Sequence, residues 1–335
     1  MIFVDNQNNY DASVNIALET YLVENKLVDE PILLFYINDP SIIVGRNQNT
    51  LEEINQAYVE KKGIRVVRRM SGGGAVYHDR GNFSFCFIKD DDGSFRDFAS
   101  FTKPVIEALH HMGAIGAELQ GRNDLLIDGK KFSGNAMYAK DGRMTAHGTI
   151  LFDADLEEVT HALKPRQEKM TSKGIKSIRS RVTNIKPFVD AEYQSLTTEE
   201  FRDKLLLAIF KVDRRQDVPE YHLTEEDWAK VEEIRQERFG NWDWNYGQSP
   251  DFDVAHARKF PFGLVDLRFN ISEGRIKEAK IYGDFFGLGD IHELEAQLVG
   301  VRYERQALKE TFEQINLQHY LGQVTAEELV SLIFD

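Results

Sequence analysis

The sequence predicts an α+β fold with a large first domain and a smaller second one. Short strand-like runs are concentrated in the first half of the chain and helical patterns follow them, as expected when strands and helices are segregated. At 335 residues, the chain is longer than a typical single domain. Residues 240–250 break every periodicity, and a new pair of strand-like runs follows them. We therefore expect a first domain over residues 1–244 and a second over residues 252–335.

The first domain is expected to open with a helix and several short strands. Between Asp11 and Glu24, apolar residues recur at helical spacing. Apolar or alternating runs that are typical of strands then follow at residues 32–37, 42–44, 64–67 and 82–88.

Two hairpins and a set of helices complete the predicted first domain. Asp128-Gly129 and Asp141-Gly142 each separate two strand-like runs, as the turn of a β-hairpin does. Helical patterns follow at residues 156–163 and 228–239, and another helix is expected to begin at Thr197, which opens a capping box.

The second domain is expected to begin after residues 240–250, whose aromatic side chains should pack against a neighbouring element. Residues 263–271 and 275–283 alternate around Ser272-Glu273-Gly274 and predict a hairpin. Two or three short helices are expected to complete this domain.

Composition and charge exclude several classes of protein. A formal charge of −14 argues against a general nucleic-acid binder and against a protein held on anionic membranes. No run reaches the roughly 20 apolar residues of a membrane span, and no secretory signal is apparent. The single cysteine, Cys86, cannot form an internal disulfide, which favours the reducing cytoplasm.

The segment Arg68–Asn82 is the strongest candidate for a binding site. It contains three consecutive glycines, Gly72 to Gly74, preceded by two arginines. Backbone amides without Cβ obstruction and two permanent cations suit a phosphate or a carboxylate. Because the loop lies between two predicted strands, it is neither a P-loop nor a dinucleotide fingerprint, both of which open a helix. A tightly bent hairpin is the alternative, which the paired arginines disfavour.

Other candidate residues are weaker when each is taken alone. Lys131 follows the Asp128-Gly129 turn, so a rigid hairpin would hold its ammonium near a reacting phosphate, although a lysine beside a turn is more often solvated. An aspartate at the start of a strand is often a capping residue, and a lone histidine is more often structural than a ligand. Asp124 and His147 therefore each have a structural alternative. Residues 164–186 contain eight Lys or Arg and one acid, which fits a phosphate site and a solvated face equally well.

Taken together, these motifs resemble those of lipoate–protein ligases of the A type. The matching stretches are Arg68-Arg69-x-Ser71-Gly72-Gly73-Gly74-Ala75-Val76-Tyr77-His78-Asp79-x-Gly81-Asn82, Gly121-Arg122-Asn123-Asp124-Leu125, Lys131-Phe132-Ser133-Gly134, His147-Gly148-Thr149 and residues 173–184. The resemblance covers nearly the whole chain. It implies the α+β catalytic domain of biotin and lipoate protein ligases, with a mixed or antiparallel sheet, followed by a small α+β C-terminal domain.

The resemblance also implies a two-step, ATP-dependent reaction. The lipoate carboxylate attacks the α-phosphate of ATP and expels pyrophosphate, and an acceptor lysine then attacks lipoyl-AMP to form an amide. The implied acceptors are the lipoyl domains of 2-oxo acid dehydrogenase acyltransferases or the glycine-cleavage H protein. Neither a nucleic acid nor a membrane is expected as a partner. Mg²⁺ would accompany ATP, with Asp124 as its candidate ligand, since this hard cation prefers oxygen donors.

Roles for individual residues come from the same resemblance. Lys131 would be the catalytic residue and would contact both ATP and the lipoyl carbonyl. The other implied ATP contacts are Arg69, Gly74, Ala75, Val76 and Tyr77. The other implied lipoate contacts are Arg68 and His147. Phosphate or adenylate contacts are implied for Lys173, Ser180 and Arg181.

Two other functions are alternatives. An octanoyl or lipoyl transferase of the same fold would need a thiol to carry a thioester. Cys86 is the only thiol, and its alternation with Phe85 and Phe87 indicates a buried small residue on the opposite face of a strand. A non-catalytic lipoyl-binding module is the second alternative, because a fold can outlast its activity, but the presence of Lys131 disfavours it.

Overall fold

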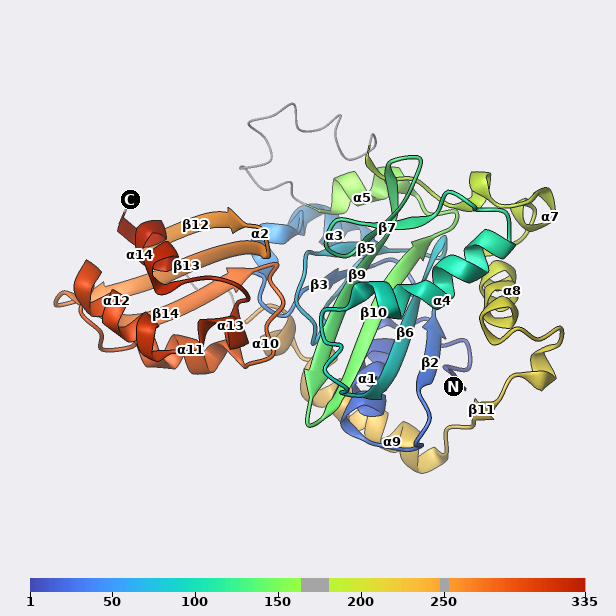
Figure 1. The fold of residues 1–335 in the computed structure, drawn as a ribbon, viewed down its shortest axis with the longest axis horizontal. Helices are drawn as coiled ribbons and strands as arrows, with labels where there is room; N and C mark the ends of the chain where they lie inside the picture. Colours follow the sequence, from blue (N-terminus) through green and yellow to red (C-terminus); the bar gives the residue numbers. More distant parts are fainter. Residues whose placement is uncertain (164–180, 248–252, 335) are drawn as a thin grey trace.

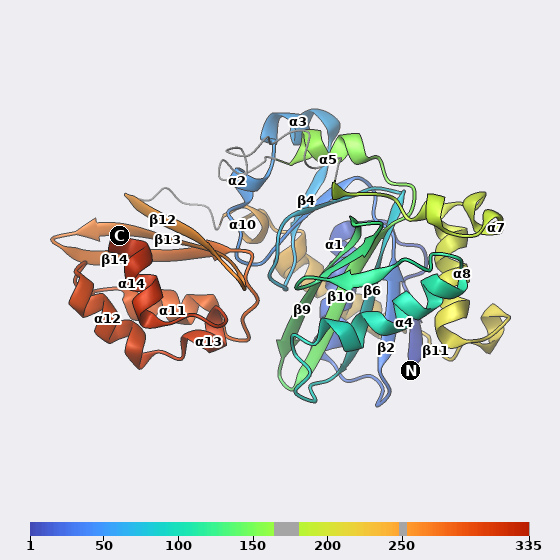
Figure 2. The ribbon, with the colours of Figure 1, turned by 45° about the horizontal axis from the view of Figure 1, so that its top comes forward.

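The computed structural model describes residues 1–163, 181–247 and 253–334, which form two bodies side by side (Figure 1). The larger body is built on an eight-stranded sheet, and the smaller one is built on three strands and short helices. The predicted α+β class is therefore confirmed. Figure 2 shows that the smaller body adjoins the larger one on the side where α2 (Thr50–Glu53) and α10 (Trp242–Asn245) lie.

The large sheet is mixed. In spatial order, its strands are β11 (Glu220–Tyr221), β1 (Ile2–Asp5), β2 (Ile32–Tyr36), β6 (Asn82–Asp90), β10 (Arg143–Leu151), β9 (Lys130–Lys140), β8 (Asp124–Ile127) and β7 (Glu118–Gln120). Strand β1 runs parallel to both of its neighbours, and the pairs from β2 to β7 are antiparallel.

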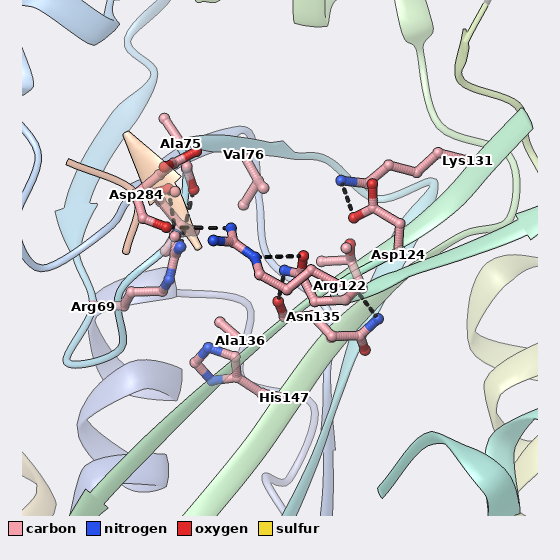
Figure 3. A pocket seen from close by; sticks show the side chains of 18 of the residues that line it. Arg69, Ala75, Val76, Arg122, Asp124, Lys131, Asn135, Ala136, His147 and Asp284 are labelled. Atoms are coloured by element: carbon pink, nitrogen blue, oxygen red, sulfur yellow. Dashed lines mark hydrogen bonds and ion pairs between the residues drawn. The ribbon is translucent and has the colours of Figure 1, made fainter. Parts of the chain in front are cut away.

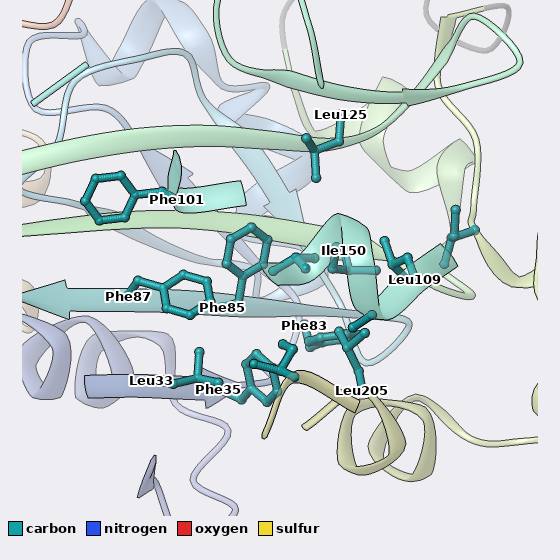
Figure 4. Close-up of a cluster of buried hydrophobic side chains, with 14 of the residues drawn as sticks. Leu33, Phe35, Phe83, Phe85, Phe87, Phe101, Leu109, Leu125, Ile150 and Leu205 are labelled. Carbon is teal, nitrogen blue, oxygen red and sulfur yellow. The ribbon is translucent and has the colours of Figure 1, made fainter. Parts of the chain in front are cut away.

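Strand β6 carries the two faces of the core. Its phenylalanines, Phe83, Phe85 and Phe87, pack with β2 and with helices α4 (Phe98–His111) and α8 (Thr198–Phe210) on one face (Figure 4). Cys86 lies on the other face, in a cluster with residues of α1 (Ala12–Glu24) and α9 (Glu225–Ile234). The predicted alternation is confirmed, and the apolar clusters on both faces fix which side of the sheet each side chain reaches.

Local signals in the sequence form the elements that they predict. Asp11 caps α1 by accepting a hydrogen bond from the Ser13 amide, and Thr197 forms the expected capping box with Glu200 at the start of α8. At the two hairpin turns, all four residues adopt positive φ, as a type I′ turn requires. These angles are 48° and 71° at Asp128-Gly129, and 50° and 77° at Asp141-Gly142.

A second, three-stranded sheet supports the glycine loop. Its order is β4 (Arg65–Arg68), β3 (Ser41–Val44) and β5 (Val76–His78), and it packs with residues of α3 (Gln56–Lys62) and α5 (Leu156–Ala162). The loop was expected to lead directly into the strand that begins at Asn82, but it enters β5 first. Three residues are too few to show a strand period, and β5 is set by its pairing with β3.

The remaining elements of the larger body, within its described residues, are short. They are α7 (Ala191–Gln194), α10, 3₁₀ turns at Lys186–Phe188 and Arg215–Asp217, and a π-helical turn at Arg235–Phe239 that follows α9. Residues 240–250, which have no periodicity in the sequence, form α10 over part of their length. The predicted aromatic packing is confirmed for Trp244, whose ring lies edge-on to Phe239 with centroids 6.1 Å apart and whose Nε1 donates to the Arg68 carbonyl at 2.8 Å, whereas Trp242 is 65% exposed.

The smaller body has its own apolar core. Strands β12 (Val254–Phe260), β13 (Gly263–Ser272) and β14 (Arg275–Gly283) form an antiparallel sheet, and β13 and β14 form the predicted hairpin. Between residues 284 and 334, the structure describes four helices where two or three were expected: α11 (Ile291–Leu298), α12 (Arg305–Gln314), α13 (Leu317–Tyr320) and α14 (Ala326–Phe334). In the described residues, no helix has the length and apolar character to cross a membrane.

The two bodies meet through main-chain and side-chain contacts. The Gly283 amide donates to the Asn47 carbonyl at 2.7 Å, and Arg268 donates to both carboxylate oxygens of Glu52 at 2.6 Å. Phe286 of the smaller body packs into the core of the larger one, 5.7 Å from the ring of Phe98. The contact therefore combines apolar burial with fixed polar pairs.

Candidate active site

A cavity of about 490 Å³ lies between the large sheet, the glycine loop and the smaller body (Figure 3). This volume is in the range of roughly 300–1,000 Å³ that is common for small-molecule sites. The smaller body contributes Lys259, Phe260, Pro261, Gly263 and Asp284 to its wall. The cavity brings together most of the predicted site residues: Arg69, Gly74, Ala75, Val76, Asp124, Lys131 and His147.

Lys131 reaches the cavity from the predicted hairpin arm. Strands β8 and β9 hold it next to Asp124, and its Nζ lies 2.8 Å from Asp124 Oδ1 (Figure 3). Both side chains are 39% exposed, so the ion pair remains open to a ligand. The hairpin therefore presents a cation and a carboxylate to the same cavity.

The chain returns beside Lys131 after residue 180. Val182 forms a parallel bridge with Lys131, and the Thr183 amide donates to the Lys131 carbonyl at 2.9 Å. Arg181, one of the predicted phosphate contacts, is therefore adjacent in sequence to a residue that pairs with Lys131, and it is exposed. The predictions for Lys173 and Ser180 fall outside the described residues.

The glycine loop presents unpaired amides. Among the described residues, the backbone amides of Gly73, Gly74 and Ala75 have no hydrogen-bond acceptor. Gly73 has φ of 94°, a conformation that favours glycine, and a Cβ at Gly74 would meet nothing within 4 Å. A loop of this kind suits an anion, because its amides can all donate to one group.

Arg69 holds the loop in this shape. Its side chain is buried and donates to the carbonyls of Ile43, Gly72 and Gly74, at 3.1, 2.6 and 2.9 Å, and to Ser71 Oγ at 2.9 Å. Burial lowers the pKa of Arg69 to about 10, so the group remains cationic at neutral pH. It adds positive charge beneath the loop as well as order.

Arg68 and the Tyr77 side chain lie away from the cavity. Tyr77 packs in the cluster of α3 and α5, which leaves only its backbone near the loop. Arg68 is 2% exposed, and its guanidinium is surrounded by oxygen atoms. These acceptors are the carbonyls of Gly45, Arg46, Gln48, Trp244 and Asn245 and the hydroxyl of Thr50. Arg68 therefore fastens α10 to the small sheet.

His147 lines the cavity, but both of its ring nitrogens are engaged. Nδ1 lies 2.5 Å from Glu19 Oε1, and Nε2 lies 2.7 Å from Ser71 Oγ. Burial raises the pKa of Glu19, but the charge and hydrogen bond of His147, with hydrogen bonds from Cys86 and Tyr36, bring it below its usual value. An ionised Glu19 therefore orients His147, and His147 in turn positions Ser71 at the start of the glycine loop.

Cys86 does not have the properties of a nucleophile. Its side chain is fully buried, as predicted, and its Sγ donates to Glu19 Oε2 at 3.2 Å. Burial, followed by the charge of Glu19 and this hydrogen bond, raises the pKa of the thiol well above its usual value. A thiolate is the reactive form of cysteine, so this environment argues against transfer through a thioester.

Some residues of the site were not predicted from the sequence. Glu19 lies in the helix predicted from Asp11 to Glu24, but no role was inferred for it, although an acid between Leu18 and Tyr21 on an otherwise apolar face could have indicated a buried partner. Arg122 lies in a quoted motif, but no role was inferred for it. It lines the cavity and contacts the carbonyl oxygens of Phe262 and Asp284. No sequence pattern predicted that residues of the smaller body line the cavity, because only the folded arrangement of the chain brings them to its wall.

Two family models match most of the chain. The Lipoyl protein ligase A/B catalytic domain matches residues 11–210, and the Bacterial lipoate protein ligase C-terminus matches residues 249–333. Among curated relatives, Lipoate-protein ligase LplJ of Bacillus subtilis is 52% identical over 335 residues, which cover 100% of both chains.

Solved structures agree with this match. P. falciparum LipL1 in complex with lipoate is 27% identical, with a TM-score of 0.77 over 94% of both chains. A bi-partite ligase from Thermoplasma acidophilum, studied with its E2 lipoyl domain, is 29% identical, with a TM-score of 0.63 over 76% of this chain and 98% of that one. Lipoate-protein ligase A bound with ATP is 26% identical, with a TM-score of 0.57 over 74% and 97%. The chain therefore belongs to the lipoate–protein ligase family.

Proposed function

We propose that the chain attaches lipoate to a lysine of an acceptor protein in two steps, through a lipoyl-AMP intermediate. The observation that carries this proposal is that Lys131 and the unpaired amides of the glycine loop line one cavity. Together they supply a cation and an anion-binding loop around one reacting phosphate. Relatives solved with lipoate and with ATP support both substrates.

The glycine loop would bind the phosphates of ATP. Its amides at Gly73 to Ala75 have no acceptor in the part of the chain that the structure describes, and Arg69 fixes the loop in place through the carbonyls of Gly72 and Gly74. Such donors are ordered before charge develops, and the loss of one typically costs about 100- to 1,000-fold in rate. Arg69 would therefore act on ATP mainly through the loop.

Lys131 would act in both steps. In the first step, a lipoate carboxylate oxygen forms a bond to the α-phosphorus as the bond to pyrophosphate breaks, and the Lys131 ammonium stabilises the charge on the phosphate oxygens. In the second step, the neutral amine of the acceptor lysine forms a C–N bond as the acyl–phosphate C–O bond breaks and AMP leaves, and the proton that the amine loses passes to the departing phosphate or to solvent. Lys131 would stabilise the developing oxyanion of the lipoyl carbonyl.

The lipoyl chain would lie along the apolar part of the cavity wall. Ile16, Ile43, Val76 and Ala136 line this part. His147 would border the lipoyl group without a free ring nitrogen to offer it. Arg68 is not retained as a lipoate contact, because its guanidinium is occupied by oxygen atoms outside the cavity.

Magnesium would accompany ATP. Asp124 lines the cavity, and its Oδ1 lies 2.8 Å from Lys131 Nζ. Mg²⁺ in nucleotide sites usually takes one or two protein carboxylates and completes its shell with phosphate oxygens and water, so this donor set fits. When bound, the ion would neutralise charge on the phosphates.

The acceptors would be lipoyl domains of 2-oxo acid dehydrogenase acyltransferases or the glycine-cleavage H protein. The archaeal relative studied with its E2 lipoyl domain supports the first of these. We also propose residues 1–244 as the catalytic domain and residues 252–335 as an accessory domain, because each has its own apolar core. The single buried thiol supports a cytoplasmic location.

A reconstituted assay tests this function. Protein, ATP, Mg²⁺, lipoic acid and an apo lipoyl domain should give a lipoylated acceptor, detected by intact mass, together with released pyrophosphate. Lys131→Ala should abolish the product, and Cys86→Ser should retain it. Product formed without ATP, or full activity in Lys131→Ala, would overturn the proposal. Loss of product in a folded Cys86→Ser variant would favour the transferase mechanism.

A further inference from the structure

His78 lies in the cavity wall with one ring nitrogen unpaired. Its side chain is 4% exposed and lines the cavity. On β5 it shares a face with Val76, which also lines the cavity, whereas Tyr77 between them packs on the opposite face. Nδ1 lies 2.9 Å from Asn38 Nδ2, but the buried Nε2 has no hydrogen-bond partner among the described residues.

A chain of asparagine amides fixes the tautomer of His78. Asn15 Nδ2 donates to the Asn9 carbonyl at 2.8 Å, and a carbonyl can only accept, so the orientation of the Asn15 amide is set. The same Nδ2 donates to Asn38 Oδ1 at 2.8 Å, which leaves Asn38 Nδ2 as the donor to His78 Nδ1. Because Nδ1 accepts, the ring proton of neutral His78 resides on Nε2.

The ring of His78 is neutral under working conditions. Burial, with smaller contributions from the charges of Arg69 and His147, lowers its pKa to about 3. The residue is therefore an uncharged Nε2–H donor in the wall of a cavity that also exposes cations. A buried donor without an acceptor destabilises a fold, so native structures almost always provide a partner.

We propose that His78 is a substrate-contact residue whose Nε2–H donates to an oxygen atom of bound ATP or of the bound acid. The proposal rests on the proposed function for the identity of these two ligands. A neutral donor can bind an oxygen without adding charge to a site that already contains Arg69 and Lys131. Asn38 would be a positioning residue, because it acts on the substrate only through the imidazole.

A buried water is the competing explanation. Ser41 lies opposite His78 in the β3–β5 pair, and its hydroxyl is also buried without a partner among the described residues. One water could bond both groups, since buried waters commonly join such atoms. In that case the removal of either side chain would affect stability and leave ligand affinity unchanged.

Calorimetric titrations separate the two explanations. The full chain is titrated separately with lipoic acid and with α,β-methylene-ATP, which cannot be adenylated. His78→Leu removes the donor, His78→Gln keeps an N–H group close to the position of Nε2, and Ser41→Ala is the control. His78→Leu should lower the affinity for one of the two ligands by about 5- to 10-fold, which is the usual effect of one hydrogen bond. The affinities of His78→Gln and Ser41→Ala should lie within about twofold of wild type. The ligand whose affinity falls is the one that supplies the oxygen atom bound by His78.

Nitrogen NMR of the wild-type protein gives a test that needs no variant to fold. Labelled His78 should show the Nε2–H tautomer, and its Nε2 proton should shift when one of the two ligands binds. Unchanged affinity of His78→Leu for both ligands, or an unchanged Nε2 signal with both, would overturn the contact. Neither measurement needs turnover. The proposed function is tested separately by the lipoylation assay, and a lack of activity there would reject it without affecting the test of the His78 contact.

Discussion

Replacement of Gly72 by alanine should disturb the contact between the glycine loop and the smaller body. A Cβ at Gly72 would lie 2.2 Å from the carbonyl oxygen of Phe285 and 3.2 Å from its carbonyl carbon. These are main-chain atoms, which cannot rotate away as a side chain can. Gly74 provides a matched control in the same loop, because a Cβ there would meet nothing within 4 Å and neither glycine has a positive φ.

The size of the effect follows from this overlap. Overpacking of a well-packed contact typically costs about 1–3 kcal/mol, which corresponds to a fall of roughly 2–10 °C in melting temperature for a domain of this size. Relief of the overlap would move the loop or Phe285. Asp284 lines the cavity beside Phe285, so the wall would shift as well. We therefore expect the rate of lipoate adenylation to fall together with stability.

Calorimetric melting and pyrophosphate release measure both consequences. Gly72→Ala should melt earlier and react more slowly than wild type, and Gly74→Ala should match wild type in melting temperature. If Gly72→Ala has the melting temperature and the turnover of the wild-type protein, the close approach of Gly72 to Phe285 is refuted. An equal loss of stability in Gly74→Ala would show that the overlap is not the cause.

Other substitutions test the inner side of the site. Arg68→Met should lower the melting temperature and leave the affinity for lipoic acid unchanged, because Arg68 bonds oxygens outside the cavity; a weaker titration with lipoic acid would contradict this placement. Glu19→Gln should reduce pyrophosphate release by about 10-fold, since an amide holds His147 less firmly than a carboxylate. The lowered pKa of folded Glu19 gives stability that is present above its usual value of 4.5 and is lost as pH falls below it. The difference in melting temperature between wild type and Glu19→Gln should therefore narrow from about pH 7 to about pH 4, and a constant difference would contradict the ionised state of Glu19.

Signals that are local in the sequence predicted the fold well. The turn at Asp128-Gly129 has one low-energy shape, and the capping box at Thr197 determines where α8 begins, so neither depends on distant contacts. The alternation of phenylalanines along β6 likewise identified its two faces. Strand β5 and helix α4 lacked such signals, since one is very short and the other contains Pro104.

The site was predicted less completely, because its charges are arranged by long-range packing. Arg68 is the last residue of β4 and Arg69 follows it, and their side chains have separate sets of partners, so only Arg69 lines the cavity. The partnership of Glu19 with His147 joins residues from α1 and β10, and Asp284 enters the wall from the smaller body. These contacts join residues that are far apart in the sequence, so no sequence pattern could predict them.

The bonds from Arg69 to the carbonyls of Gly72 and Gly74 also bear on the kinetics of nucleotide capture. A triple-glycine segment without such bonds would sample many shapes, and an incoming anion would have to select one of them. Here the guanidinium restricts that search before any ligand arrives, so less conformational entropy is lost on binding. Nucleotide association should therefore be a single fast phase limited by diffusion and charge, without a slow rearrangement of the loop.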